Sequence, residues 1–201
     1  PVRIGEPIEK KHINQRRTHV GSPIDYVRDN HLFTTNAIAT AAVEVEFFNL
    51  VPGNKMADDS TTVTKGHTNM DVAGKLAKGW RFTAWALALM FEEDSDIIDI
   101  RALRKYSWIE VKMQKMEAQM LHPRLMGCGV PLSLYGTSAF EHTTSNGMGA
   151  LAVLPLKNPI LLENEESFSV LWKWAPAVTL NATQFVQMVL LGDREQPSPG
   201  S

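Results

Sequence analysis

Apolar and polar side chains alternate most clearly near the C-terminal end of the chain. Within residues 167–174 every second side chain is apolar: Phe168, Val170, Trp172 and Trp174. A period of two places these side chains on one face of a β-strand, and we expect them to point inward. Residues 183–191 are rich in Val, Leu and Phe and predict a second strand. We expect the two strands to form an antiparallel pair, joined by the short connection between them.

Earlier segments carry the same kinds of pattern. Alternation over residues 43–47 and 107–116 predicts two half-buried strands. The almost unbroken apolar run at 80–91 contains good helix formers, but its opening Trp-Arg-Phe-Thr and the acidic residues that end it favour a strand. Such a strand is covered on both faces or lies in an interface between subunits. Two further short strands are expected at 150–156 and 159–162.

One short helix is predicted over residues 96–104. Its apolar residues share one face, its acidic side chains come first and its basic side chains come last, which complements the helix dipole. Either Asp94 or Ser95 is expected to be the N-cap. Two polar, turn-rich segments, 55–78 and 121–149, are expected to be loops.

Together these elements predict an all-β protein. We expect an antiparallel β-sandwich or barrel of about eight strands with one short helix, because strands and turns follow one another without the strand–helix alternation that builds a parallel sheet. The predicted domain spans residues 31–194. Residues 1–30 lack hydrophobic periodicity and are expected to be an extended N-terminal arm, and residues 195–201 are expected to be a flexible C-terminal tail.

Composition narrows the class of protein. The chain has 201 residues, of which 44% are hydrophobic, and this is enough apolar material for the core of one domain. The formal net charge of −2 argues against a dedicated nucleic-acid-binding protein with a broad basic face. The single cysteine, Cys128, excludes an internal disulfide, favours a reducing compartment and is expected to be small and buried. The longest apolar run, 84–91, is too short to span a bilayer as a helix.

Basic side chains gather in the predicted arm. They are candidate contacts with a neighbouring subunit or with nucleic acid: Lys10, Lys11, Arg16 and Arg17. The polar N-terminal end predicts no signal peptide, and a first residue that is Pro1 rather than Met predicts trimming.

No motif in the chain predicts catalysis. It has no Gly-x-Ser-x-Gly elbow and no phosphate-binding glycine loop, and its histidines are never two apart, as a cupin-type metal enzyme would require. His67 and Asp71 lie close together in a polar segment and are weak evidence for a metal site. We therefore expect no enzymatic activity, no metal and no cofactor. The alternative class is a carbohydrate- or partner-binding β-sandwich, which needs one tryptophan exposed beside polar loop residues.

The C-terminal third of the chain supports a more specific expectation. Residues 158–170, NPILLENEESFSV, place a polar turn before a strand that begins SFSV, and the last strand ends in LLG at Gly192. This ending resembles the last strands of jelly-roll virion structural proteins, the capsid-type proteins of viruses and bacteriophages. The resemblance implies a jelly-roll β-sandwich that assembles with copies of itself and with other virion proteins into a capsid or a virion appendage. It also implies an arm that ties neighbouring subunits together, and a location in the virion after assembly in the host cytoplasm.

Overall fold

The computed structural model describes residues 26–92, 95–114, 116–123 and 153–196. These residues form eight strands and one helix, in this order along the chain: β1 (Tyr26–Ile38), β2 (Glu44–Phe47), β3 (Arg81–Phe91), α2 (Ile97–Arg104), β4 (Ser107–Met113), β5 (Met116–Leu121), β6 (Val153–Leu162), β7 (Phe168–Trp174) and β8 (Gln184–Gln196). The prediction of a mostly β protein with one short helix is confirmed.

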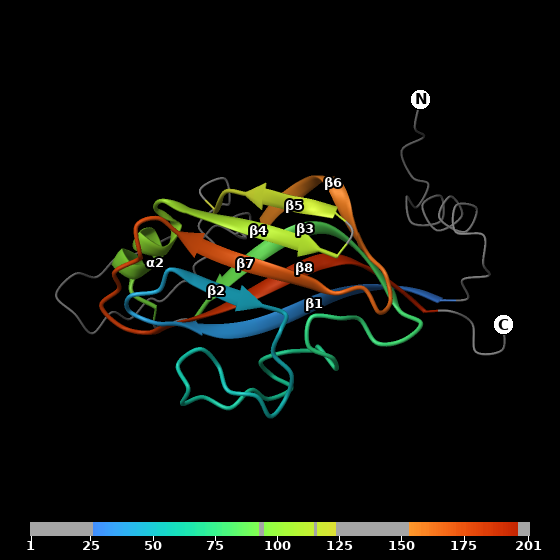
Figure 1. Ribbon diagram of the computed structural model, residues 1–201, viewed down its shortest axis with the longest axis horizontal. Helices are drawn as coiled ribbons and strands as arrows, with labels where there is room; N and C mark the ends of the chain where they lie inside the picture. The colour runs from blue at the N-terminus through green and yellow to red at the C-terminus, as the bar shows by residue number, and fades with distance from the viewer. Residues whose placement is uncertain (1–25, 93–94, 115, 124–152, 197–201) are drawn as a thin grey trace, which may run out of the picture.

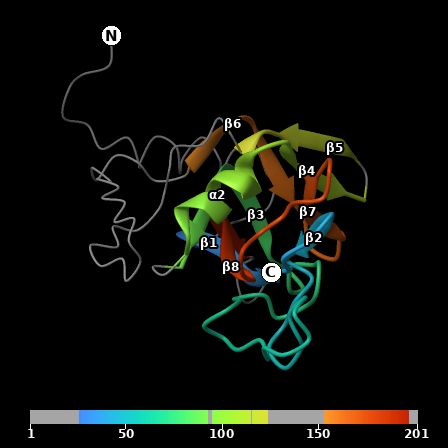
Figure 2. The same cartoon turned by 90° about the vertical axis from the view of Figure 1, so that its left-hand side faces the viewer.

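The strands build two antiparallel sheets. Sheet A has four strands in the order β1-β8-β3-β6, and sheet B has four strands in the order β2-β7-β4-β5. Sheet B lies in front of sheet A in Figure 1, and the end-on view of Figure 2 shows the two sheets as facing layers. The predicted antiparallel sandwich is therefore confirmed at this level.

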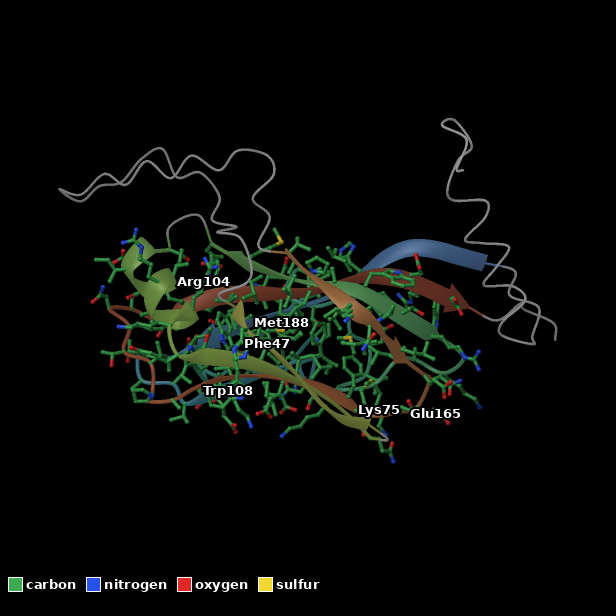
Figure 3. The ribbon with its side chains drawn as sticks, turned by 90° about the horizontal axis from the view of Figure 1, so that it is seen from above. Phe47, Lys75, Arg104, Trp108, Glu165 and Met188 are labelled. Atoms are coloured by element: carbon green, nitrogen blue, oxygen red, sulfur yellow. The ribbon has the colours of Figure 1, made fainter. Side chains whose placement is uncertain are left out.

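The hydrophobic core fills the space between the two sheets. Across sheet A the register aligns Leu32, Leu190 and Leu87, all buried on the inner face. Phe47 of β2 and Met188 of β8 lie between the sheets in Figure 3. Each fully buried side chain of this size contributes about 1.5–3 kcal/mol through removal of apolar surface from water. The inward direction predicted for the alternating side chains of β7 is also confirmed: Phe168, Val170, Trp172 and Trp174 are all buried.

The apolar run at 80–91 is a strand, as predicted. It forms β3, which pairs with β8 on one side and with β6 on the other. Its pairing with β8 shifts register between Ala84 and Ala86, so Trp85 is the extra residue of a β-bulge against β8. The shift in its pairing with β6 has the opposite origin, because the extra residues there lie in β6 between Pro155 and Ile160. Most of the strand is buried, which explains why its sequence lacks the simple alternation of a half-exposed strand.

The helix closes one end of the sandwich (Figure 1). Its N-cap is Asp96, not Asp94 or Ser95, because Asp96 has an extended backbone and its side chain accepts a hydrogen bond from the Ile98 N–H at 2.9 Å. At the other end of α2, the Trp174 indole N–H donates to the Leu103 carbonyl at 2.7 Å. The same tryptophan therefore fills the core and satisfies a free carbonyl of the helix.

The predicted pairing of the two C-terminal strands is wrong. β7 belongs to sheet B and β8 belongs to sheet A, so the connection between them crosses from one layer to the other. The pattern shows which face of each strand is buried, and the inner faces of two opposed sheets look alike in sequence. Alternation alone therefore does not distinguish a neighbour in the same sheet from a partner across the core.

Several boundaries also differ from the prediction. β1 begins at Tyr26, so residues 26–30 of the predicted arm belong to sheet A, and β8 continues to Gln196, which pairs with Tyr26. The strand predicted to reach Met116 ends earlier, and a separate strand, β5, follows it. The two short strands predicted at 150–162 are one strand, β6, whose prolines are tolerated because β6 is at the edge of sheet A.

Candidate assembly and binding surfaces

The outer face of sheet A carries apolar side chains on all four strands, among polar ones such as Gln187 and Asp193. The register aligns Phe33, Val189, Ala88 and Val153 in one row, directed away from the core. Large apolar side chains gather on this face and remain exposed to solvent: Trp85 by 39%, Met90 by 48% and Leu161 by 48%. Exposed apolar side chains grouped on one face are typical of an interaction surface.

Two details give this face a defined shape. The Trp85 indole N–H donates to Asp193 Oδ2 at 2.8 Å, so the polar atom of the ring is satisfied inside the protein. Its remaining surface is apolar, which suits burial against another molecule. Beside Met90 lies a hollow of about 270 Å³, which is bordered by Thr35, His67 and Phe185. A protruding side chain of a partner could fit into this hollow.

The outer face of sheet B is charged instead. Lys173 of β7 lies 3.0 Å from Glu110 of β4 and 3.9 Å from Glu44 of β2, and Lys112 lies 3.6 Å from Glu110. The Trp108 indole N–H donates to Glu110 Oε1 at 2.7 Å. This hydrogen bond, together with that from the Lys173 ammonium, lowers the pKa of the Glu110 carboxyl. The two outer faces of the sandwich therefore differ in chemistry: one exposes large apolar side chains and the other carries paired charges.

Replacing Glu110 with glutamine tests the charge network on sheet B. The folded pKa of Glu110 is lowered, so its contribution is present above the ordinary carboxyl pKa and is lost as the pH falls through the folded value. We expect Glu110→Gln to reduce the free energy of unfolding by at most about 1 kcal/mol at neutral pH. Urea unfolding of both proteins across the acid range should show this difference disappearing. Glu44→Gln is the control, and an equal effect there would contradict a special role of Glu110.

The edges of sheet A are protected along much of their length. The Asn69 side chain follows β1 like a short strand, since its Oδ1 accepts from the Phe33 N–H at 2.9 Å and its Nδ2 donates to the His31 carbonyl at 2.6 Å. The Thr35 N–H donates to the His67 carbonyl at 2.6 Å. The opposite edge, β6, carries two prolines, which cannot donate to an added strand. Faces of the sandwich are therefore better suited to association than these edges.

A second hollow, here named the end hollow, lies at the end of the sandwich opposite α2. Two labelled residues mark that end in Figure 3: Glu165, and Lys75, which directly follows the lining residue Gly74 in the sequence. The end hollow has a volume of about 430 Å³ and is formed where β2, the 73–74 loop, β4 and the start of β7 meet. Its polar side chains come from all of these segments except the loop: Glu46, Asn49, Lys112, Gln114, Ser167 and Ser169.

The structure places the predicted site residues as follows. Lys10, Lys11, Arg16 and Arg17 lie outside the described residues, as does Cys128. His67 lies in a loop, where its Nδ1 accepts a hydrogen bond from the Thr64 N–H at 3.1 Å. Within residues 26–92, 95–114, 116–123 and 153–196, no group of three His, Cys, Asp or Glu side chains is arranged to hold a metal ion.

The tryptophans separate into buried and accessible residues. Trp172 and Trp174 are core residues, and Trp80 lies beneath the Arg194 guanidinium, which is 3.7 Å from the ring centroid. Trp85 is the most exposed of them, but it lies in the middle of a strand rather than beside polar loops. Trp108 of β4 is partly exposed on the outer face of sheet B, where its indole N–H is bound to Glu110. A tryptophan platform for carbohydrate next to loop residues stays a prediction.

Sequence reasoning missed both the outer face of sheet A and the end hollow. The apolar run of β3 carried a signal for the outer face of sheet A, because it predicts a strand that is covered on both faces or lies in an interface. That signal does not show which positions of the run are exposed. The end hollow joins residues that are far apart in the chain, and its one local signal is Gly74, which has φ +62° and approaches the Phe168 carbonyl.

Comparisons with protein-family models, with curated proteins and with solved structures found no match. The helical part of the described chain contains no segment with both the length and the apolar character that a membrane crossing requires. Any functional conclusion therefore rests on the strand order and on the chemistry of the surfaces described above.

Proposed function

We propose that this chain is a jelly-roll subunit that assembles with copies of itself into a shell, as a capsid protein or another structural component of a virion. The observation that carries the proposal is the strand order. β1 pairs with β8, β2 with β7, β3 with β6 and β4 with β5, all antiparallel. These are the pairings of one long hairpin whose tip lies between β4 and β5.

The remaining pairings support a rolled form of this hairpin. β8 also pairs with β3, and β7 also pairs with β4. When a long two-stranded ribbon wraps around a core, successive strand pairs fall alternately into two sheets, and these extra contacts join them. The result is an eight-stranded double sheet of the jelly-roll type. The resemblance of the C-terminal segment to virion proteins points in the same direction.

The two outer faces support self-association. A subunit of a shell needs surfaces that bury apolar area against other copies. The outer face of sheet A offers Trp85, Met90 and Leu161, while the charges on sheet B are paired with one another. A second copy of the chain is the occupant that we assign to the apolar face. The basic arm residues remain candidate contacts with neighbouring subunits or nucleic acid.

The second candidate is a binding module rather than a shell subunit, and enzymatic activity is not proposed. A jelly roll also serves lectin domains and cupins. The end hollow favours a lectin-type role over a cupin-type role, because it is lined by hydrogen-bonding side chains and its lining contains no set of metal-binding histidines. A binding role at that end is compatible with self-association through sheet A.

Lysine substitutions on the outer face of sheet A test the proposal. We expect the full chain to form large particles in light scattering and electron microscopy as its concentration rises. The double variant Met90→Lys/Leu161→Lys should reduce the assembled fraction at least about tenfold, because two charges would be buried in each contact. Its circular dichroism should match that of the unchanged protein, since both side chains are exposed.

Val43→Lys is the matched control, because Val43 is also an exposed apolar residue, 60% exposed, and lies next to sheet B. It should assemble like the unchanged protein. A chain that stays monomeric at every concentration would refute self-assembly. Full assembly of Met90→Lys/Leu161→Lys would show that the copies meet through another surface.

A further inference from the structure

We propose that the end hollow is a binding site for a neutral, polyhydroxylated ligand, that is, a carbohydrate. The end hollow is within the size range of small-ligand sites, roughly 300–1,000 Å³. It combines polar groups with some apolar surface, which is the general composition of such sites. Three properties of its lining select the ligand class: the state of its charges, its available hydrogen-bonding groups and the stiffness of its walls.

The charges that border the end hollow have partners within the protein. Glu46 Oε2 accepts a hydrogen bond from Asn49 Nδ2 at 2.9 Å, and Lys112 lies 3.6 Å from Glu110. One carboxylate and one ammonium group therefore face the same space, and neither sign of charge prevails. A strongly anionic or cationic ligand gains little there, whereas a neutral ligand meets no repulsion.

Hydrogen-bonding capacity remains open around these charges. Asn49 Oδ1 has no hydrogen-bond partner among the described residues, while its Nδ2 is occupied by Glu46. This oxygen has almost no exposed surface, so a ligand in the end hollow reaches it when the Asn49 side chain turns toward that space. A buried carbonyl oxygen of this kind favours a ligand that brings an O–H or N–H donor. The hydroxyls of Ser167 and Ser169 and the amide of Gln114 line the same space. Hydroxyl groups both donate and accept, so a sugar matches this mixture.

The walls of the end hollow are held by backbone hydrogen bonds. The Gly74 N–H donates to the Phe48 carbonyl at 2.7 Å, and the Phe168 N–H donates to the Gly74 carbonyl at 2.9 Å. The Gln114 N–H donates to the Ser167 carbonyl at 3.1 Å. These bonds tie four segments together, so the site is formed before a ligand arrives. Ala73 supplies exposed apolar surface that a sugar ring can cover with its C–H face, whereas Met113 and Phe168, which also border the end hollow, are buried in the core.

Saturation-transfer NMR and calorimetry with the full chain test this inference directly. The probes are the neutral sugars glucose, galactose, mannose and N-acetylglucosamine, with N-acetylneuraminic acid and glucosamine as charged comparisons. We expect saturable binding of at least one neutral sugar, with an affinity that does not depend on salt concentration. Asn49→Leu should weaken that binding about tenfold or more by removing the unpaired acceptor.

Ser169→Ala, which removes one hydroxyl with little risk to the fold, should weaken binding as well. Asn158→Leu on β6 is the matched control and should bind like the unchanged protein. The inference is overturned if no neutral sugar binds at high concentration, if binding is confined to a charged probe and declines with salt, or if Asn49→Leu and Ser169→Ala bind normally. These outcomes leave the proposed self-assembly untouched, because that depends on the other sheet and is measured by particle formation.

Discussion

Replacing Asp99 with alanine should lower the free energy of unfolding by about 3 kcal/mol. Asp99 lies in the first turn of α2 and is 1% exposed. Its carboxylate accepts hydrogen bonds from the Asn181 N–H at 2.9 Å, the Ala182 N–H at 3.3 Å and Gln184 Nε2 at 2.9 Å. Alanine leaves the Asn181 and Ala182 N–H groups without this acceptor and leaves Gln184 Nε2 with only the Ala182 carbonyl at 3.4 Å. Each buried donor that loses its partner costs roughly 1–3 kcal/mol.

The position of Asp99 explains why we expect so large an effect. Asn181 and Ala182 belong to the connection that carries the chain from β7 in sheet B to β8 in sheet A. A single carboxylate on α2 thus fixes the place where the two layers are joined. Loss of Asp99 should loosen this crossing and the end of the sandwich that α2 covers.

Urea unfolding followed by tryptophan fluorescence measures this effect, at a protein concentration where light scattering detects no particles. Asp96→Ala is the comparison, because Asp96 is an exposed aspartate of the same helix and its loss as N-cap should cost about 1 kcal/mol. Equal stabilities for Asp99→Ala and Asp96→Ala would contradict the role assigned to the buried carboxylate. The free energy of unfolding of Asp99→Asn should lie between those of Asp99→Ala and Asp96→Ala, since an amide retains only one acceptor atom.

The fold could be predicted from the sequence wherever burial alone determines the pattern. The alternation in β7 identified four core side chains, and the acidic end of the run at 80–91 separated a strand from a helix. The pattern could not predict which strands pair with one another, because a strand faces the core in the same way whichever sheet it joins. The crossing from β7 to β8 depends on Asp99, which is far from both strands in the chain.

The candidate surfaces were harder to predict for a related reason. Val189 and Ala88 on the outer face of sheet A are as apolar as core residues, and only the register shows that they point away from the core. Asn49 and Ser169 meet in the end hollow because β2 and β7 are neighbours. Contacts of this kind follow from the order of strands, which short-range patterns do not contain.

Gly192→Ala should destabilise the protein by about 3 kcal/mol, through a clash rather than through a lost contact. Gly192 lies in β8, between Asn30 of β1 and Ala84 of β3. A Cβ atom at this position would be 2.0 Å from the Thr83 carbonyl oxygen and 2.9 Å from the Ala84 Cα. Both atoms belong to the backbone beside the bulge of β3, so relief requires a shift of a central strand.

Gly66→Ala is the matched control, because a Cβ there would meet only the Thr64 hydroxyl at an ordinary 3.6 Å. We expect this variant to change the free energy of unfolding by no more than about 0.5 kcal/mol in the same urea experiment. The β-bulge beside Gly192 provides a second measurement that distinguishes Gly192→Ala from Gly66→Ala. Gly192→Ala should also move Trp85, the extra residue of the bulge, and therefore change tryptophan fluorescence of the folded state. A Gly192→Ala protein as stable as Gly66→Ala would show that β3 and β8 approach less closely than the register requires.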